Sequence, residues 1–112
     1  MLDVAKADGA LVFGLIRQRL PHCTAIAFGS RVNGWPCRGA AKPYSDLDIA
    51  LRGLCPSDDQ ALAHLRADLE ESRVPWRVDL SNAQDLPDGL RDLVRRAGVV
   101  LQGKIDHPTQ AA

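Results

Sequence analysis

The sequence predicts one small α/β domain, and three observations lead to that fold class. The chain has 112 residues, a length that fits a single domain. Hydrophobic residues make up 46% of it, enough for a packed core, and aromatic residues only 4%, so this core must be aliphatic. Apolar runs of strand length alternate with stretches of helical periodicity, as they do in α/β proteins.

The N-terminal half predicts a helix, a strand and a loop. Apolar residues recur at near-helical spacing over residues 2–20, and Pro21 ends the helix because it cannot donate the next hydrogen bond. Residues 24–28 form a short apolar run that ends at a glycine, which indicates a buried strand. Residues 31–44 contain two glycines and two prolines, a composition typical of a turn followed by an exposed loop.

The middle of the chain predicts two strands on either side of a helix. Side chains alternate over residues 45–52, with leucine and isoleucine on one face, which indicates a half-buried strand. Ser57 is placed to cap a helix that continues to about Ser72, because its hydroxyl can accept a hydrogen bond from the first turn. Residues 74–80 are the next strand candidate.

A helix and a short strand complete the expected domain. The helix covers residues 88–97 and ends at Gly98, a residue type that often terminates helices. Residues 99–101 form the final strand. The domain is therefore expected to span residues 1–103, followed by a frayed polar tail at 104–112.

The charge balance restricts the possible partners. Fourteen basic residues balance fourteen acidic ones, whereas a general nucleic-acid binder relies on a basic excess to hold phosphates. Any nucleotide is therefore expected to be a small substrate, with no polymeric nucleic acid as partner. No apolar stretch reaches the roughly 20 residues of a membrane span, so a cytoplasmic protein without a membrane partner is expected.

The cysteines and histidines predict neither a disulfide framework nor a zinc site. Three widely spaced cysteines favour reduced thiols in the cytosol. The three histidines share no ligand spacing, so they are expected at the surface or in local packing. These residues are Cys23, Cys37, Cys55, His22, His64 and His107.

Three aspartates are the strongest candidates for chemistry. Asp46 and Asp48 are two residues apart on a predicted strand, so their side chains leave the same face and repel each other unless a cation lies between them. Asp79 adds a carboxylate from a separate strand. Three converging carboxylates can hold two Mg²⁺ ions that flank a phosphoryl transfer. An Asp-x-Asp pair alone is more often incidental, on the solvent face of an edge strand.

A Gly-Ser pair upstream changes that interpretation. Gly29 and Ser30 end a predicted strand, where backbone N–H groups and a hydroxyl can hold polyphosphate oxygens. Glycine allows the phosphate to approach closely because it has no Cβ. The pair is a common loop dipeptide, so it is informative only in combination with the aspartates.

The combined motifs resemble the DNA polymerase β-like nucleotidyltransferase superfamily, and the small size is similar to its minimal nucleotidyltransferases. The matching stretches are Gly29-Ser30-Arg31, residues 45–51 and residues 78–81, within a resemblance that covers about residues 20–102. The resemblance implies a small mixed β-sheet backed by helices. It also implies Mg²⁺ ions held by Asp46, Asp48 and Asp79, and ATP bound by Gly29, Ser30 and Arg31.

The resemblance implies a partner as well. Members of this family are commonly antitoxins of helical HEPN-type ribonuclease toxins, and they transfer AMP from ATP to a tyrosine of the toxin. Two alternatives stay open: an antitoxin that neutralises its partner by binding alone, and nucleotidyl transfer to a small molecule such as an aminoglycoside. The complete aspartate trio favours the enzyme, since occlusion does not need three convergent carboxylates.

Several cationic and aromatic residues have a less specific interpretation. Residues 31–45 are longer than the usual family spacing, which predicts a surface loop or a lid whose Arg38 or Lys42 reaches phosphates. Trp76 is expected to pack at the core or its rim. The last helix carries Arg91, Arg95 and Arg96, which predict a solvated face with a partner contact as the alternative.

Overall fold

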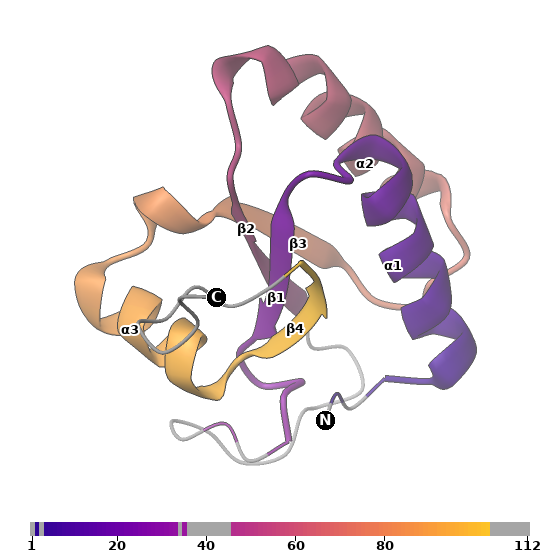
Figure 1. The fold of residues 1–112 in the computed structure, drawn as a ribbon. Helices are drawn as coiled ribbons and strands as arrows, with labels where there is room; N and C mark the ends of the chain where they lie inside the picture. The colour runs from indigo at the N-terminus through magenta and orange to yellow at the C-terminus, as the bar shows by residue number, and fades with distance from the viewer. Residues whose placement is uncertain (1, 3, 34, 36–45, 104–112) are drawn as a thin grey trace.

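A four-stranded mixed sheet with helices on both faces organises residues 2, 4–33, 35 and 46–103, which the computed structural model describes (Figure 1). The strands are β1 (Thr24–Phe28), β2 (Leu47–Arg52), β3 (Val78–Asn82) and β4 (Val99–Gln102). β1 pairs antiparallel with β2 and β4, while β2 pairs parallel with β3, so the order is β3-β2-β1-β4. The predicted α/β class with a mixed sheet is confirmed.

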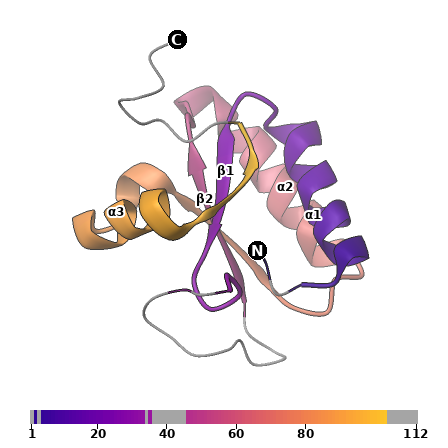
Figure 2. The ribbon, with the colours of Figure 1, turned by 60° about the horizontal axis from the view of Figure 1, so that its bottom comes forward.

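Two helices cover one face of the sheet and a third covers the other (Figure 2). α1 (Lys6–Arg19) and α2 (Asp59–Glu71) lie side by side, and the Arg19 guanidinium donates to the Asp68 carboxylate across them at 2.8 Å. α3 (Asp88–Ala97) lies on the opposite face. The longest of the described helices has 14 residues, too short to cross a membrane.

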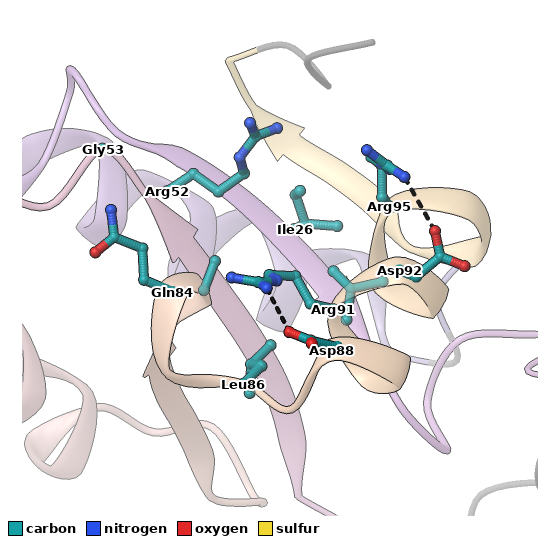
Figure 3. A pocket seen from close by; sticks show the side chains of 11 residues that line it. Ile26, Arg52, Gly53, Gln84, Leu86, Asp88, Arg91, Asp92 and Arg95 are labelled. Carbon is teal, nitrogen blue, oxygen red and sulfur yellow. Dashed lines mark hydrogen bonds and ion pairs between the residues drawn. The ribbon is translucent and has the colours of Figure 1, made fainter.

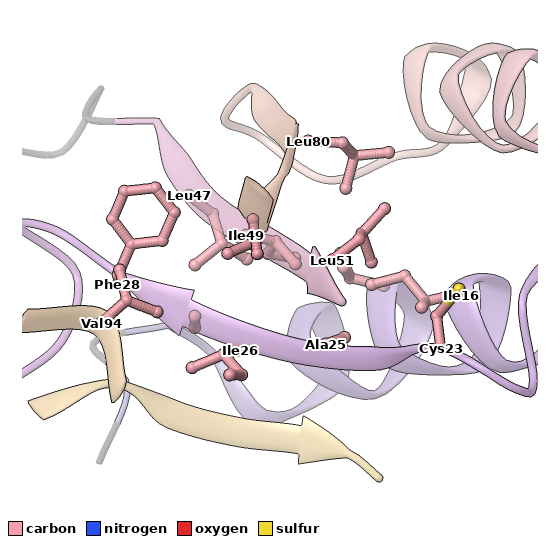
Figure 4. Packing of buried hydrophobic residues seen from close by; sticks show 14 of the residues in the cluster. Ile16, Cys23, Ala25, Ile26, Phe28, Leu47, Ile49, Leu51, Leu80 and Val94 are labelled. Carbon is pink, nitrogen blue, oxygen red and sulfur yellow. The ribbon is translucent and has the colours of Figure 1, made fainter. Parts of the chain in front are cut away.

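The core is mainly aliphatic, as predicted, with Phe28, Trp35 and Trp76 as its buried aromatic members, and it fills both sides of the central strands (Figure 4). The largest fully buried side chains are Ile16, Leu20, Ile26, Leu47, Ile49, Leu51, Leu65, Val12 and Cys23. The expected half-buried strand is present as β2, with Leu47, Ile49 and Leu51 buried on one face and Asp48 and Arg52 partly exposed on the other. Ala50, on the same face as Asp48, is also fully buried, because α3 and the 3₁₀ turn η2 (Ala83–Asp85) lie over that face.

Ser57 does not cap α2. It lies in a 3₁₀ turn, η1 (Pro56–Asp58), that precedes the helix. The last residue of this turn holds it in place, since the Asp58 carboxylate accepts a hydrogen bond from the Cys55 N–H at 2.8 Å. The predicted end of the helix near Ser72 is confirmed.

The later elements match the expectation with two differences. β3 begins at Val78 rather than at residue 74, because Pro75 has no N–H to donate to a strand ladder. Gly98 ends α3, but its φ of −70° is open to any residue. Glycine is needed there for close packing, since a Cβ would lie 2.5 Å from Cγ2 of Ile26 in β1.

Gln102, at the end of β4, closes the corner between α1 and β1. Its side-chain amide donates to the carbonyl oxygens of Leu20 and Cys23, both at 2.8 Å. These bonds give a structural role to a residue for which the sequence suggested none. Residues 36–45 and the segment 104–112, with the predictions for Arg38, Lys42, Cys37, His107 and the tail, lie outside the described residues.

Candidate active site

The three predicted aspartates gather on one face at one end of the sheet. Asp48 lies in β2 and Asp79 in β3, and the parallel register pairs these two residues directly. Asp46 immediately precedes β2 and is exposed. Side chains two positions apart leave the same face of a strand, and neighbouring strands lie about 4.8 Å apart. The three carboxylates therefore share one small region.

The electrostatics of Asp48 favour a bound cation. Its pKa is raised from the usual 3.8 to about 6, mainly by burial and further by the charges of Asp79 and Asp46. The repulsion that the sequence predicted within the trio is therefore present at Asp48. A divalent cation would turn this repulsion into attraction, and carboxylate oxygens are ligands that Mg²⁺ prefers. The donor set fits that metal.

Gly29 brings the predicted phosphate turn next to the carboxylates. It follows β1 directly, and its φ of +86° lies in the left-handed region that favours glycine. A Cβ at this position would lie 2.6 Å from Oδ2 of Asp48. The backbone therefore favours glycine, and the absence of a Cβ leaves room for the Asp48 carboxylate; the close approach of phosphate stays a prediction. The N–H of Val32 donates to the Gly29 carbonyl at 3.0 Å and closes the turn.

Aromatic side chains hold this turn in place. The Arg31 guanidinium lies 5.1 Å from the centre of the Trp76 ring, and the Arg31 residue is only 5% exposed. On the other side, the Trp35 and Phe28 rings are 6.2 Å apart. Trp76 is buried, as its expected packing role requires. The predicted contact of Arg31 with nucleotide stays a prediction, and in this structure its side chain packs against the protein.

A cavity of about 590 Å³ opens on the Asp48 face of the sheet (Figure 3). Ile26 and Arg52 of the central strands line it. Ile26 pairs with Ala50, two residues beyond Asp48, and this register places the cavity on the same face as the carboxylates. The remaining walls are formed by Gly53 after β2, by residues of η2 and α3, and by Leu86 between these two elements.

The arginines of α3 are paired along their own helix. Arg91 donates to Asp88 at 2.6 Å, and Arg95 and Arg96 donate to Asp92 at 3.0 and 2.9 Å. All three arginines are exposed, in agreement with the predicted solvated face. The side chains of Arg91 and Arg95 also line the cavity, so its mouth carries charges of both signs.

Two features of the structure were not predicted from the sequence. The alternation in β2 places Arg52 on the face of Asp48, but only the packing of η2 and α3 reveals a cavity there. The second feature is a contact of His22 with Asp58, whose side-chain N and O atoms are 2.9 Å apart. Spacing along the chain could not reveal it, because the two residues are 36 positions apart.

A Gly-Ser turn beside an aspartate trio on a small mixed sheet defines a nucleotidyltransferase domain. The probable protein adenylyltransferase MntA of Haemophilus influenzae is 38% identical over 111 residues, which cover 96% of this chain and 93% of that protein. The chain therefore belongs to the MntA family of minimal nucleotidyltransferases. The family and the enzyme class predicted from the sequence are confirmed.

A solved structure shows the same fold. It is a mutant of the toxin–antitoxin complex MntA–HpeT, and one of its chains matches with a TM-score of 0.64 at 23% identity. The match covers 86% of this chain and 73% of that one. No family model matches the sequence.

Proposed function

We propose that this nucleotidyltransferase transfers AMP from ATP to a tyrosine of a HEPN-type ribonuclease toxin and thereby acts as its antitoxin. The observation that carries the proposal is the convergence of Asp46, Asp48 and Asp79 beside the turn at Gly29. Two relatives support it, because one is named a probable protein adenylyltransferase and the other belongs to a toxin–antitoxin complex. We further propose that the protein works in the cytoplasm.

Each group at the site has a part in this proposal. The three carboxylates hold two Mg²⁺ ions, which when bound stabilise the charge that develops on the phosphates. The backbone at Gly29 and the hydroxyl of Ser30 bind the triphosphate. Arg31 supports nucleotide binding by holding this turn against Trp76.

The proposed reaction moves the AMP group from an oxygen of pyrophosphate to the hydroxyl oxygen of the acceptor. The acceptor hydroxyl oxygen bonds to the α-phosphorus of ATP, the bond between that phosphorus and the bridging oxygen breaks, pyrophosphate leaves, and the hydroxyl proton passes to solvent. The chain needs to position the acceptor beside the carboxylates. The proposed approach for the partner is along the Asp48 face, where the charged residues Arg91 and Arg95 line the cavity beside α3.

Catalysis and occlusion differ in the amount of protein that they require. We expect a small fraction of this chain, mixed with purified toxin, ATP and Mg²⁺, to modify most of the toxin, because one copy acts repeatedly. Intact mass and ribonuclease activity of the toxin measure the result, and Asp79→Asn is expected to abolish it. Neutralisation that needs equal amounts, ignores ATP and survives Asp79→Asn would instead establish a binding module.

A further inference from the structure

A second group of potential metal ligands lies at the other end of the sheet from the aspartates. His22 and Cys23 directly precede β1, and Asp58 ends the turn before α2. One ligand atom from each, a ring nitrogen, a sulfur and a carboxylate oxygen, lie within 4.8 Å of one another. The proposed nucleotidyl transfer does not use any of these three side chains.

The group is separate from the aspartate trio. At the near end of β1, Thr24 pairs with Arg52, and at the far end Phe28 pairs with Asp48. Four residues of extended strand span roughly 13 Å. A cation bound beside Thr24 would therefore not share ligands with one bound at Asp48.

The spacing of the three ligand atoms is close to that of a zinc site. Zinc binds nitrogen and oxygen at about 2.0–2.2 Å and sulfur at about 2.3 Å, so neighbouring ligand atoms lie about 3.3–3.8 Å apart in a tetrahedron. His22 Nε2 and Asp58 Oδ2 are already 2.9 Å apart. Shifts of about 1 Å in the positions of these ligand atoms would give them the spacing of a tetrahedral zinc site.

Two of the three ligands are fixed by the fold. Oδ2 of Asp58 accepts the Cys55 N–H at 2.8 Å, and this side chain is 13% exposed. Cys23 is a free thiol that is 1% exposed, and its carbonyl is held by Gln102. The side chain of His22 is 50% exposed, so a cation can reach the group from solution on that side.

The chemistry of the three ligands indicates the kind of cation. Thiolate, imidazole and carboxylate together select a borderline-soft metal rather than Mg²⁺.

We propose that His22, Cys23 and Asp58 form a binding site for Zn²⁺ or a cation of the same class, with water completing the coordination. The bound ion links the segment before β1 to the start of α2 and stabilises the folded chain. The sequence predicted no zinc site because the third ligand lies far along the chain from the adjacent His22-Cys23 pair.

Cobalt substitution tests the site directly. The full chain, reduced and stripped of metal, is titrated with Co²⁺ in excess Mg²⁺, which occupies the aspartate trio. We expect a thiolate-to-cobalt charge-transfer band that saturates at one equivalent and is removed by Zn²⁺. We also expect Zn²⁺ to raise the melting temperature of the wild-type chain.

Matched variants decide which residues bind. His22→Ala removes a half-exposed side chain, so it is expected to fold and to weaken Co²⁺ binding at least tenfold. His64→Ala, which removes an exposed histidine from α2, is expected to bind like the wild type. Absence of the band in the wild type, its survival in Cys23→Ala, or unchanged binding by His22→Ala would each overturn the proposal. Because Cys23 is buried, the His22→Ala result holds even if Cys23→Ala fails to fold.

Discussion

The two faces of β2 have different properties within one strand. Leu47, Ile49 and Leu51 are fully buried and face α1 and α2. Asp48 is partly exposed on the opposite face, where it pairs with Asp79. Consecutive side chains of a strand point to opposite faces, so residues that are neighbours in sequence belong to different environments. One face supplies stability and the other supplies a carboxylate site, and single substitutions along β2 separate the two.

The largest expected effect is the loss of transfer in Asp46→Asn or Asp48→Asn. Removing the charge of a metal ligand is expected to reduce the rate at least about a thousandfold, or ~4 kcal/mol. Incorporation of labelled nucleotide measures the loss, and circular dichroism checks that the fold is intact. Asp59→Asn, an exposed aspartate on α2, is the matched control and is expected to keep full activity. Full transfer by both test variants would contradict the metal assignment.

On the other face, Ile49→Ala is expected to lower the free energy of unfolding by about 2–5 kcal/mol, because it leaves a cavity in a fully buried position. Denaturant melts measure this change. Leu54→Ala, at a partly buried position beside the core, is the control and is expected to have a smaller effect. Equal destabilisation of the two variants would contradict the assignment of this face as the core.

Ser30→Ala is expected to weaken binding of the triphosphate by about 1.5–3 kcal/mol, since a hydroxyl contact to a charged oxygen is lost while the backbone donors remain. Titration with a non-hydrolysable ATP analogue in Mg²⁺ measures the affinity. Ser57→Ala, at an exposed serine in η1, is the control. Unchanged affinity in Ser30→Ala would mean that the turn after β1 does not bind the phosphates.

The smallest expected effect is a change in the free energy of unfolding of Asp48→Asn when no metal is bound. The pKa of Asp48 is raised from 3.8 to about 6 in the folded chain, so the folded state holds this proton more tightly. The stability gained from protonation is complete below about pH 4 and is lost as the pH rises through about 6. Asp48→Asn avoids that loss and is expected to be more stable at neutral pH by up to about 2 kcal/mol, allowing for solvent screening.

Melting curves with a chelator, at about pH 4 and about pH 7.5, measure this difference between the variant and the wild type. We expect the difference to be near zero at the lower pH and to appear at the higher pH. Adding Mg²⁺ at the higher pH is expected to reduce it, because the cation stabilises only the wild-type carboxylate trio. A difference of the same size at both pH values would mean that Asp48 is not the group that titrates.

Local patterns predicted where the residues of the candidate site lie, because these residues obey local rules. Alternation along residues 45–52 was enough to place Asp46 and Asp48 on one face, since the two-residue period is a property of any strand. The run before Gly29 likewise predicted β1 with its observed bounds. These inferences need no knowledge of the partners of each strand.

The remaining features depend on contacts between distant segments. The register of Asp48 with Asp79 and the approach of Asp48 to Gly29 arise from strand pairing, which spacing along the chain does not encode. The burial of Ala50 could not be predicted for the same reason, because it depends on packing against η2 and α3, and α3 begins nearly 40 residues further along the chain. The nucleotide contacts of Ser30 and Arg31 stay predictions, and the titration of Ser30→Ala addresses the first of them.

The bonds of Gln102 have a consequence for biosynthesis. Its amide meets the carbonyls of Leu20 and Cys23, which precede it by 82 and 79 positions. A chain that is still growing on the ribosome makes α1 and β1 long before β4 is available to them. Until then, one edge of β1 remains open to pairing with another strand, a known route to misassembly. The corner between α1 and β1 is therefore completed only when β4 reaches β1.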